Sequence, residues 1–382
     1  MTSVPLHPPC PADFRMVDLF AGPGGLDLAA EVLGIESIGV EFDASACRTR
    51  EAAGLGTEQA DVRDRDPEHP RLVGRQILAG GPPCQTFTVA GNGVGRRALE
   101  DVLKFVQRLV NREDPETIRT ALKSFDQRTG LVLEPLRWAL RAIDLPQLAP
   151  YEAIVLEQVP AVLPVWEAYA EALKAEGYAV AHGILHTEEF GVPQTRRRAV
   201  LIARWQANHV ALPAPTHHRY RKGAGRPSGD LVRQPWVAME DVLPHRKRPP
   251  FRVVSNYGTG GDPKARGRRR SCEPSATVTG KISRNRIVSD DDVERELPRL
   301  TESEAGVLQS FPAAYPWSGQ AIAQQIGNAV PPRLGMHILS AVLDLGSPGP
   351  EDFERLEKWE TPASGSADGD SDRTPELVGG PH

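Results

Sequence analysis

The sequence predicts an α/β fold in which a doubly wound, mostly parallel sheet is joined to a smaller domain rich in loops and short strands. Short apolar runs alternate with segments whose apolar residues recur three and four positions apart. Glycine-rich turns separate these two kinds of segment, and after Ala203 the chain becomes rich in Pro, Gly and Arg. Strands that alternate with helices are typical of a parallel sheet with helices on both faces.

The larger domain should comprise residues 13–204, completed by 320–345. We expect its strands at 15–20, 38–42, 151–159 and 196–204, with a further strand that runs into a loop within 76–84. Helices are expected at 26–34, 45–53 and 166–175. Residues 93–150 form a mostly helical excursion, because VLKFVQRLV and LEPLRWALRAI carry the helical spacing of apolar residues.

The smaller domain should span 205–319, with short strands in FRVVSNYG and ATVTG and a helical run in TESEAGVLQSF. Regular structure is expected again in QQIGNAVPPRLGMHILSAVLDL. From Gly346 to the end the chain is acidic, rich in Gly, Ser and Pro and poor in large apolar residues. We expect this tail, 346–382, to be disordered.

Charge is distributed unevenly along the 382 residues. The chain has 45 Lys and Arg against 50 Asp and Glu, but residues 196–286 hold 21 basic and 5 acidic residues. This basic segment, 196–286, indicates a polyanionic partner. A solvated basic loop without a partner is the alternative.

Several classes of protein are excluded. The four cysteines form no CxxC pair, which argues against a disulfide framework or a zinc site. The N-terminus is polar and Pro-rich, without the basic and then apolar pattern of a secretion signal. No run approaches the roughly 18 apolar residues of a membrane span. We expect a cytoplasmic protein.

A glycine turn at Gly22, Gly24 and Gly25 follows the first strand. Turns without Cβ atoms let a ligand approach the backbone, and a carboxylate about twenty residues later, here Glu41, is placed for ribose hydroxyls. Phe42 could stack on a base and Asp61 could meet an exocyclic amine. Such turns also arise for tight packing alone, so both interpretations stay open.

Two further loops carry reactive groups. In GGPPCQTF, prolines stiffen the loop before Cys84, which suits a nucleophile at a sheet edge, although most lone cysteines are small buried hydrophobes. Glu157 and Gln158 end the strand YEAIVLEQ, where a partly desolvated carboxyl group can move a proton near neutral pH. An ordinary capping or ion-paired acid would look the same.

QTRRR places Arg196 and Arg198 on one side of a strand and Arg197 on the other. Two guanidinium groups on one side suggest contacts with phosphate or with a base. Surface ion pairs are the alternative.

In this order the motifs resemble those of the DNA (cytosine-5) methyltransferase family. DLFAGPGG, the Glu41–Phe42 pair, GGPPCQTF, Glu157, the QxRxR element at 194–198, RLTESEAGVLQSFP and QIGNAVPP carry the resemblance. It covers residues 15–343 apart from the basic segment, where the family has its target-recognition domain. One position departs from the family: Gln158 stands where the usual residue is Asn.

The resemblance implies a Rossmann-like S-adenosylmethionine-binding catalytic domain at 13–204 and 320–345, with target recognition at 205–319. It implies catalytic roles for Cys84, Gln85, Glu157, Gln158, Arg196 and Arg198. It also implies the following cofactor-binding residues: Phe20, Ala21, Gly22, Gly24, Gly25, Leu26, Glu41, Phe42, Asp61, Val62, Pro83, Asn328 and Val330.

The implied reaction adds the Cys84 thiolate to carbon 6 of a flipped-out cytosine, after which carbon 5 takes the methyl group. The implied product of the cofactor is S-adenosylhomocysteine, and no metal ion or membrane is involved. The resemblance also implies a monomer that acts on double-stranded DNA at the nucleoid, and it allows a separate cognate restriction endonuclease. An RNA methyltransferase of the same catalytic plan and an inactive DNA-binding module remain alternatives.

Overall fold

The computed structural model describes residues 10–83, 94–123, 130–243, 250–255 and 267–361. The predicted site residues Cys84 and Gln85 lie outside these residues, as do Asn256 and the basic cluster HRKR at 245–248. The remaining predicted site residues are all described.

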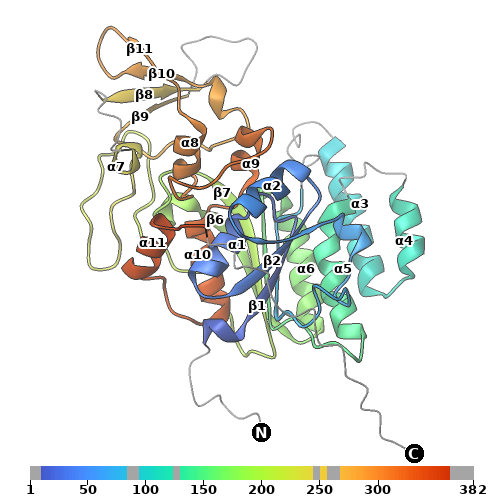
Figure 1. Cartoon of the computed structure of the whole chain (residues 1–382). Coiled ribbons are helices and arrows are strands. Elements are labelled where there is room, and N and C mark those ends of the chain that lie inside the picture. The colour runs from blue at the N-terminus through green and yellow to red at the C-terminus, as the bar shows by residue number, and fades with distance from the viewer. Residues whose placement is uncertain (1–9, 84–93, 124–129, 244–249, 256–266, 362–382) are drawn as a thin grey trace, which may run out of the picture.

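A seven-stranded sheet forms the larger part of the molecule (Figure 1), with strand order β3-β2-β1-β4-β5-β7-β6. β1 to β5 run parallel to one another, whereas β7 is antiparallel to both β5 and β6. The predicted fold class, a doubly wound and mostly parallel sheet with a smaller part, is therefore confirmed. The strands are β1 (Arg15–Leu19), β2 (Glu36–Glu41), β3 (Gly56–Gln59), β4 (Ile77–Gly80), β5 (Ala153–Gln158), β6 (Tyr178–His186) and β7 (Arg197–Trp205).

Helices cover both faces of this sheet, and each face has its own apolar core. One core packs α3 (Val94–Val110), α5 (Glu134–Asp144) and α6 (Leu163–Ala175) onto the sheet, with α4 (Pro115–Leu122) beside α3. The core on the other face packs α1 (Gly25–Val32) and α10 (Pro332–Leu343) onto the sheet. The helix α2 (Ala44–Ala52) connects β2 to β3. Because β1 leads to β2 on one side and pairs with β4 on the other, the order reverses at β1, where open α/β sheets bind ligands.

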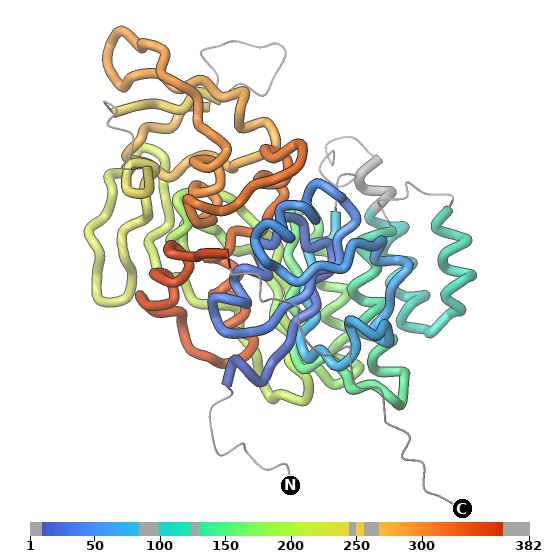
Figure 2. The backbone as a smooth tube through the Cα atoms, in the orientation of Figure 1, coloured from blue at the N-terminus to red at the C-terminus, as the bar shows by residue number. Residues whose placement is uncertain are grey.

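The smaller part is built on a four-stranded antiparallel sheet of order β11-β10-β8-β9. It has a separate apolar core that includes Phe251, Ile287 and Leu308. Its elements are β8 (Phe251–Val254), β9 (Arg268–Arg270), β10 (Arg286–Ser289), β11 (Glu296–Leu297), α7 (Met239–Val242) and α8 (Glu302–Leu308), and α9 (Ile322–Asn328) packs against the same core. In Figure 2 the chain of α8 to α10 runs back from this sheet to the first strands and helices.

Three local predictions need correction. β3 and β6 were not expected, because GTEQ has no apolar run and the apolar run that opens YAVAHGILH is short and interrupted by His182 and Gly183. ATVTG is not a strand. Its Val278 amide instead donates to the side chain of Gln194, so this segment is held by side chains rather than by a ladder.

The prediction that 346–382 is disordered is wrong for residues 346–361. α11 (Pro350–Glu357) packs through Phe353, Leu356 and Trp359 onto the core of α1 and α10. The guanidinium of Arg333 lies 3.7 Å from the centre of the Phe353 ring. Three apolar residues at helical spacing suffice to hold this helix, although the composition of the whole tail is polar. Residues 362–382 lie outside the described part.

A fully buried ion pair lies beneath the turn that joins β1 to α1. Arg50 on α2 donates from Nη1 to Oδ2 of Asp27 at 2.6 Å and from Nη2 to Oδ1 at 3.0 Å, and both side chains have zero exposure. Arg50 also donates to the Gly56 carbonyl at 2.7 Å and to Thr57 at 3.2 Å. Burial by itself lowers the pKa of Arg50, but the Asp27 carboxylate outweighs this and raises it above its ordinary value.

We expect Arg50→Met to lower the free energy of unfolding by about 3–5 kcal/mol, because it leaves the buried Asp27 carboxylate without its counter-charge. Urea unfolding monitored by circular dichroism measures this. Arg48→Met, on the exposed face of the same helix, should change stability by less than about 0.5 kcal/mol. Asp27→Leu combined with Arg50→Met should recover part of the loss, and an Arg50→Met effect as small as that of Arg48→Met would contradict the assignment.

Candidate active site

The predicted site residues gather at the carboxyl edge of the large sheet. Gly22 follows β1, Glu41 ends β2, Pro82 follows β4 and Glu157 lies near the end of β5. Because these four strands run in the same direction, the four positions share one edge. The start of β7, with Arg198, reaches the same edge because β7 runs in the opposite direction.

The glycine turn has an unusual backbone. Phe20, Gly22 and Gly24 have φ angles of 60°, 55° and 99°. A Cβ on Gly25 would lie 2.0 Å from the Val330 carbonyl oxygen, so this glycine lets the chain before α10 pack against the turn. A Cβ on Gly22 would have no neighbour within 4 Å. Gly22 therefore presents bare backbone to an open space.

The carboxylate of Glu41 faces this turn. Its Oε2 accepts from the Gly22 amide at 2.7 Å and its Oε1 accepts from the Asp43 amide at 2.7 Å. The neighbouring ring of Phe42 is 73% exposed, which is unusual for a large apolar side chain. Open backbone, a fixed carboxylate and an exposed ring are what an adenosine-containing cofactor needs, so these residues fit S-adenosylmethionine.

The side chain of Asp61 caps the short helix Val62–Asp64 and accepts from Arg63 Nη2 at 2.5 Å. That hydrogen bond lowers the pKa of Asp61. Val62 is buried, and its carbonyl accepts from Arg137 at 3.1 Å. Both residues are therefore in fixed positions beyond β3, next along the sheet edge from Glu41.

The side chains of the other predicted cofactor-binding residues differ in how far they are exposed to solvent. Ala21, Leu26 and Val330 are buried, so the side chain of Leu26 belongs to the core shared with α10. Asn328 is exposed and accepts from Gln324 at 2.8 Å, while Pro83 is half-buried.

Glu157 is 4% exposed and pairs with a guanidinium. Arg198 Nε lies 2.6 Å from Glu157 Oε1. Burial lowers the pKa of Arg198 and the charge of Glu157 opposes that shift. The predicted catalytic acid and the predicted base-holding arginine thus meet in a largely dry environment, where hydrogen bonds to a charged group are strong.

Gln158 turns its amide to the loop after β4. Its Nε2 donates to the carbonyl of Pro82, and its Oε1 accepts from the Val159 amide at 2.5 Å. The side chain is half-buried and both ends of its amide are hydrogen-bonded, so it does not point into solvent. The loop residue that it holds is two positions before Cys84.

Arg196 does not have the exposure that contact with a phosphate or base requires. It is 2% exposed and donates to the carbonyls of Val278, Gly327 and Ala329 at 3.1, 3.0 and 3.3 Å. Burial lowers its pKa well below the usual value. The structure argues against the predicted contact with phosphate or base: three backbone carbonyls accept from the two Nη atoms of Arg196, which indicates a positioning residue.

Gln194, two positions before Arg196, also holds distant parts of the chain together. Its Oε1 accepts from the Val278 amide at 2.8 Å and its Nε2 donates to Gln309 Oε1 at 2.6 Å. Gln309 in turn donates to the Ile326 carbonyl at 2.7 Å. The QxRxR element thus joins β7 to both the smaller part and the chain before α10.

Sequence reasoning missed the residues beneath the glycine turn. The Tyr315 hydroxyl donates to the Pro23 carbonyl at 2.5 Å, and Arg50 lies below Gly24. A lone tyrosine almost three hundred positions away along the chain carries no local signal for this contact. A buried arginine in a polar helix carries none either.

Comparison with known proteins decides the family. The model of the C-5 cytosine-specific DNA methylase family matches residues 14–119 and 152–344. The chain belongs to this family. The methylase is 27% identical over 366 residues to the type II methyltransferase M1.HphI of Haemophilus parahaemolyticus, covering 87% of each chain. It is 26% identical over 348 residues to M.NgoMIV of Neisseria gonorrhoeae, covering 86% of this chain and 98% of the relative.

Solved structures share the fold of the methylase. The Dnmt2 methyltransferase of S. pombe superposes with a TM-score of 0.59 at 17% identity, covering 87% of this chain and 99% of the other. A DNA modification methyltransferase described as putative and encoded within an E. coli prophage gives 0.55 at 17% identity, with coverage of 87% and 99%. In the described part of the methylase, no helix is long and apolar enough to cross a membrane, and no cluster of His, Cys, Asp and Glu could hold a metal ion.

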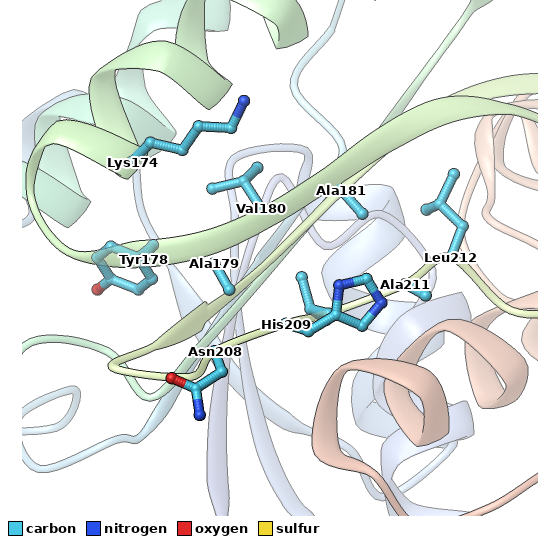
Figure 3. Close-up of a pocket in the computed structure, with 10 residues that line it drawn as sticks. Lys174, Tyr178, Ala179, Val180, Ala181, Asn208, His209, Ala211 and Leu212 are labelled. Carbon is cyan, nitrogen blue, oxygen red and sulfur yellow. The ribbon is translucent and has the colours of Figure 1, made fainter.

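The methylase also has an open groove of about 520 Å³ away from this edge (Figure 3). Tyr178, Val180 and Leu212 line it, with Lys174 and His209 at its sides. Tyr178 begins β6, which runs parallel to β5, so the groove lies toward the amino ends of these strands. It is therefore separate from the site at the carboxyl edge.

We expect Gln158→Ala to lower the methylation rate at least about ten-fold with the fold intact, because the Pro82 carbonyl loses a partner worth roughly 1–3 kcal/mol. Single-turnover methylation measures this. Gln158→Asn retains the amide but is one methylene shorter, so it should cost less than Ala yet stay below the wild type. Wild-type kinetics for Gln158→Ala would remove this residue from the site.

Proposed function

We propose that this methylase transfers a methyl group from S-adenosylmethionine to carbon 5 of cytosine within a specific duplex DNA sequence, through a covalent Cys84 adduct. The observation that carries the proposal is the buried Glu157–Arg198 pair, 2.6 Å apart, at the same sheet edge as the open glycine turn. A carboxyl group at this position supports a role in proton transfer close to a bound cofactor.

Each residue has a chemical task. Carbon 5 of cytosine is a weak nucleophile, so the Cys84 sulfur first forms a bond to carbon 6 while ring nitrogen 3 takes a proton shared with Glu157. Arg198 holds Glu157 and the base carbonyl. S-adenosylmethionine supplies an electrophilic methyl group to carbon 5. Loss of the carbon 5 proton to a base, with return of the nitrogen 3 proton to Glu157, then releases the Cys84 thiolate and restores the aromatic ring.

The target base has to leave the helix before this can happen. A stacked cytosine is inaccessible to Cys84 and Glu157, and extrusion costs a few kcal/mol. Contacts from the basic segment with phosphates offset that cost. Gln158 supports the same step, since its hydrogen bond to Pro82 fixes the start of the loop that carries Cys84.

The relatives named type II methyltransferases support a place in a restriction–modification system. In such a system a cognate endonuclease would cleave the same sequence when it is unmethylated. We propose that the methylase acts as a monomer and needs no metal ion, since Cys84, Glu157 and Arg198 supply the nucleophile, the proton and the positive charge.

Activity and target sequence can be measured together. DNA from cells that express the methylase should show 5-methylcytosine at one recurring sequence after bisulfite sequencing. In parallel, purified protein should transfer labelled methyl groups to duplex DNA and not to tRNA. Transfer to tRNA alone would favour an RNA substrate, and no transfer to either would favour an inactive DNA-binding protein.

We expect duplex DNA containing 5-fluorocytosine at the target to trap the protein as a stable adduct, because fluorine cannot leave as a proton does. Denaturing gel electrophoresis measures the trapped fraction. Cys84→Ser should bind DNA and cofactor yet form no adduct. Cys272→Ser removes an exposed cysteine elsewhere and should trap like the wild type. Adduct formation by Cys84→Ser would refute the assignment of the nucleophile.

A further inference from the structure

Arg197 and Arg219 both lie near His186, the last residue of β6. Arg197 immediately precedes Arg198 on β7, and its position is paired with His186 at the end of β6. Arg219, on the chain that leaves β7, places Nη2 2.5 Å from His186 Nε2 and 3.1 Å from His186 Nδ1. Both arginines are exposed. Alternation along β7 directs Arg197 to the other face of the sheet from Arg198.

Arg197 and Arg219 differ from several other arginines of the basic segment, which form ion pairs with carboxylates. Arg226 pairs with Asp241, Arg270 with Asp290 and Arg286 with Glu296. Among the described residues, no carboxylate forms an ion pair with Arg197 or Arg219. Their charges are therefore available to an external anion.

The ionisable groups around Arg197 and Arg219 preserve the positive charge of these two arginines. Glu188, 3% exposed, has its carboxylate 3.8 Å from His186 Nδ1. Burial raises the pKa of Glu188 to about 7, so roughly half of these groups are uncharged at neutral pH. Burial and the two guanidinium groups lower the pKa of His186 to about 4. A neutral imidazole accepts a hydrogen bond and so orients Arg219.

Hydrogen bonds also hold the chain next to Arg219 in place. Arg269 of β9 donates to the Tyr220 hydroxyl at 2.8 Å and to Thr195 Oγ1 at 3.4 Å, and it lies 4.4 Å from the centre of the Tyr220 ring. This ties the residue after Arg219 to the residue before Arg196. The two exposed arginines are thus held on two braced segments.

We propose that Arg197 and Arg219, oriented by His186, bind a backbone phosphate of the DNA strand next to the extruded cytosine. Guanidinium groups match phosphate oxygens in geometry and charge, and a pair of them can hold one phosphate from two sides. S-adenosylmethionine has no phosphate, so the anion comes from the nucleic acid. This inference rests on the proposed function, because the phosphate would belong to the duplex DNA substrate, and Arg197 directly precedes Arg198 on β7.

The test is the salt dependence of DNA binding by full-length protein. Arg197→Ala combined with Arg219→Ala should weaken binding about ten-fold, equally for cognate and scrambled duplexes. The slope of log affinity against log salt should fall by about 1, as expected for one lost phosphate contact. Affinity for S-adenosylmethionine and the thermal unfolding temperature should stay unchanged.

A matched control removes two exposed charges elsewhere. Arg15→Ala combined with Arg355→Ala, at the amino edge of β1 and on α11, should leave the slope unchanged. If the alanine variant unfolds, Arg197→Gln combined with Arg219→Gln replaces it and should show the same fall in slope. A folded double variant with the slope of the control would overturn the inference.

This failure can be distinguished from failure of the proposed function. If the wild type methylates duplex DNA but the slope does not change in the double variant, the phosphate site alone is wrong. If the wild type methylates no cytosine while the double variant still loses a phosphate contact, the phosphate site stands and the proposed reaction is wrong.

Discussion

The buried pair of Asp27 and Arg50 supports the cofactor side of the methylase. It joins α1 to α2, and through the Gly56 carbonyl it reaches β3. A Cβ on Gly39 of β2 would lie 2.2 Å from Arg50 Nη2, so that glycine makes room for the guanidinium. Burying two charges costs several kcal/mol, and the bidentate geometry with further acceptors offsets this cost. The glycine turn therefore rests on a rigid polar base rather than on an apolar one.

A second constraint joins the two parts of the molecule. Arg196 donates to a carbonyl between β9 and β10 and to carbonyls at the end of α9 and just before α10. Gln194 binds the same segment between β9 and β10 and also the end of α8. The same strand continues to Arg198 and its contact with Glu157. The three alternate positions of QxRxR thus divide the work: two hold the framework together, and the third faces the reacting groups.

The local parts of the fold and site could be predicted from the sequence. The glycine turn, Glu41 at the end of a strand and Glu157 at the end of another follow from strand and turn patterns within a few residues. Residues whose partners are distant in sequence could not be predicted. The buried state of Arg196 depends on carbonyls more than eighty positions away, and an isolated RxR pattern cannot distinguish a buried arginine from an exposed one. α11 was missed because the average composition of the acidic tail concealed three apolar residues at helical spacing.

The contact between Gly25 and Val330 has a consequence for how the protein is made. The turn after β1 is synthesised long before the carbonyl of Val330 and the hydroxyl of Tyr315 that enclose it, which lie about three hundred positions further along the chain. A nascent chain that lacks α10 has its glycine turn open on that side. The turn is therefore enclosed only once synthesis has passed Val330, long after β1 itself has been made.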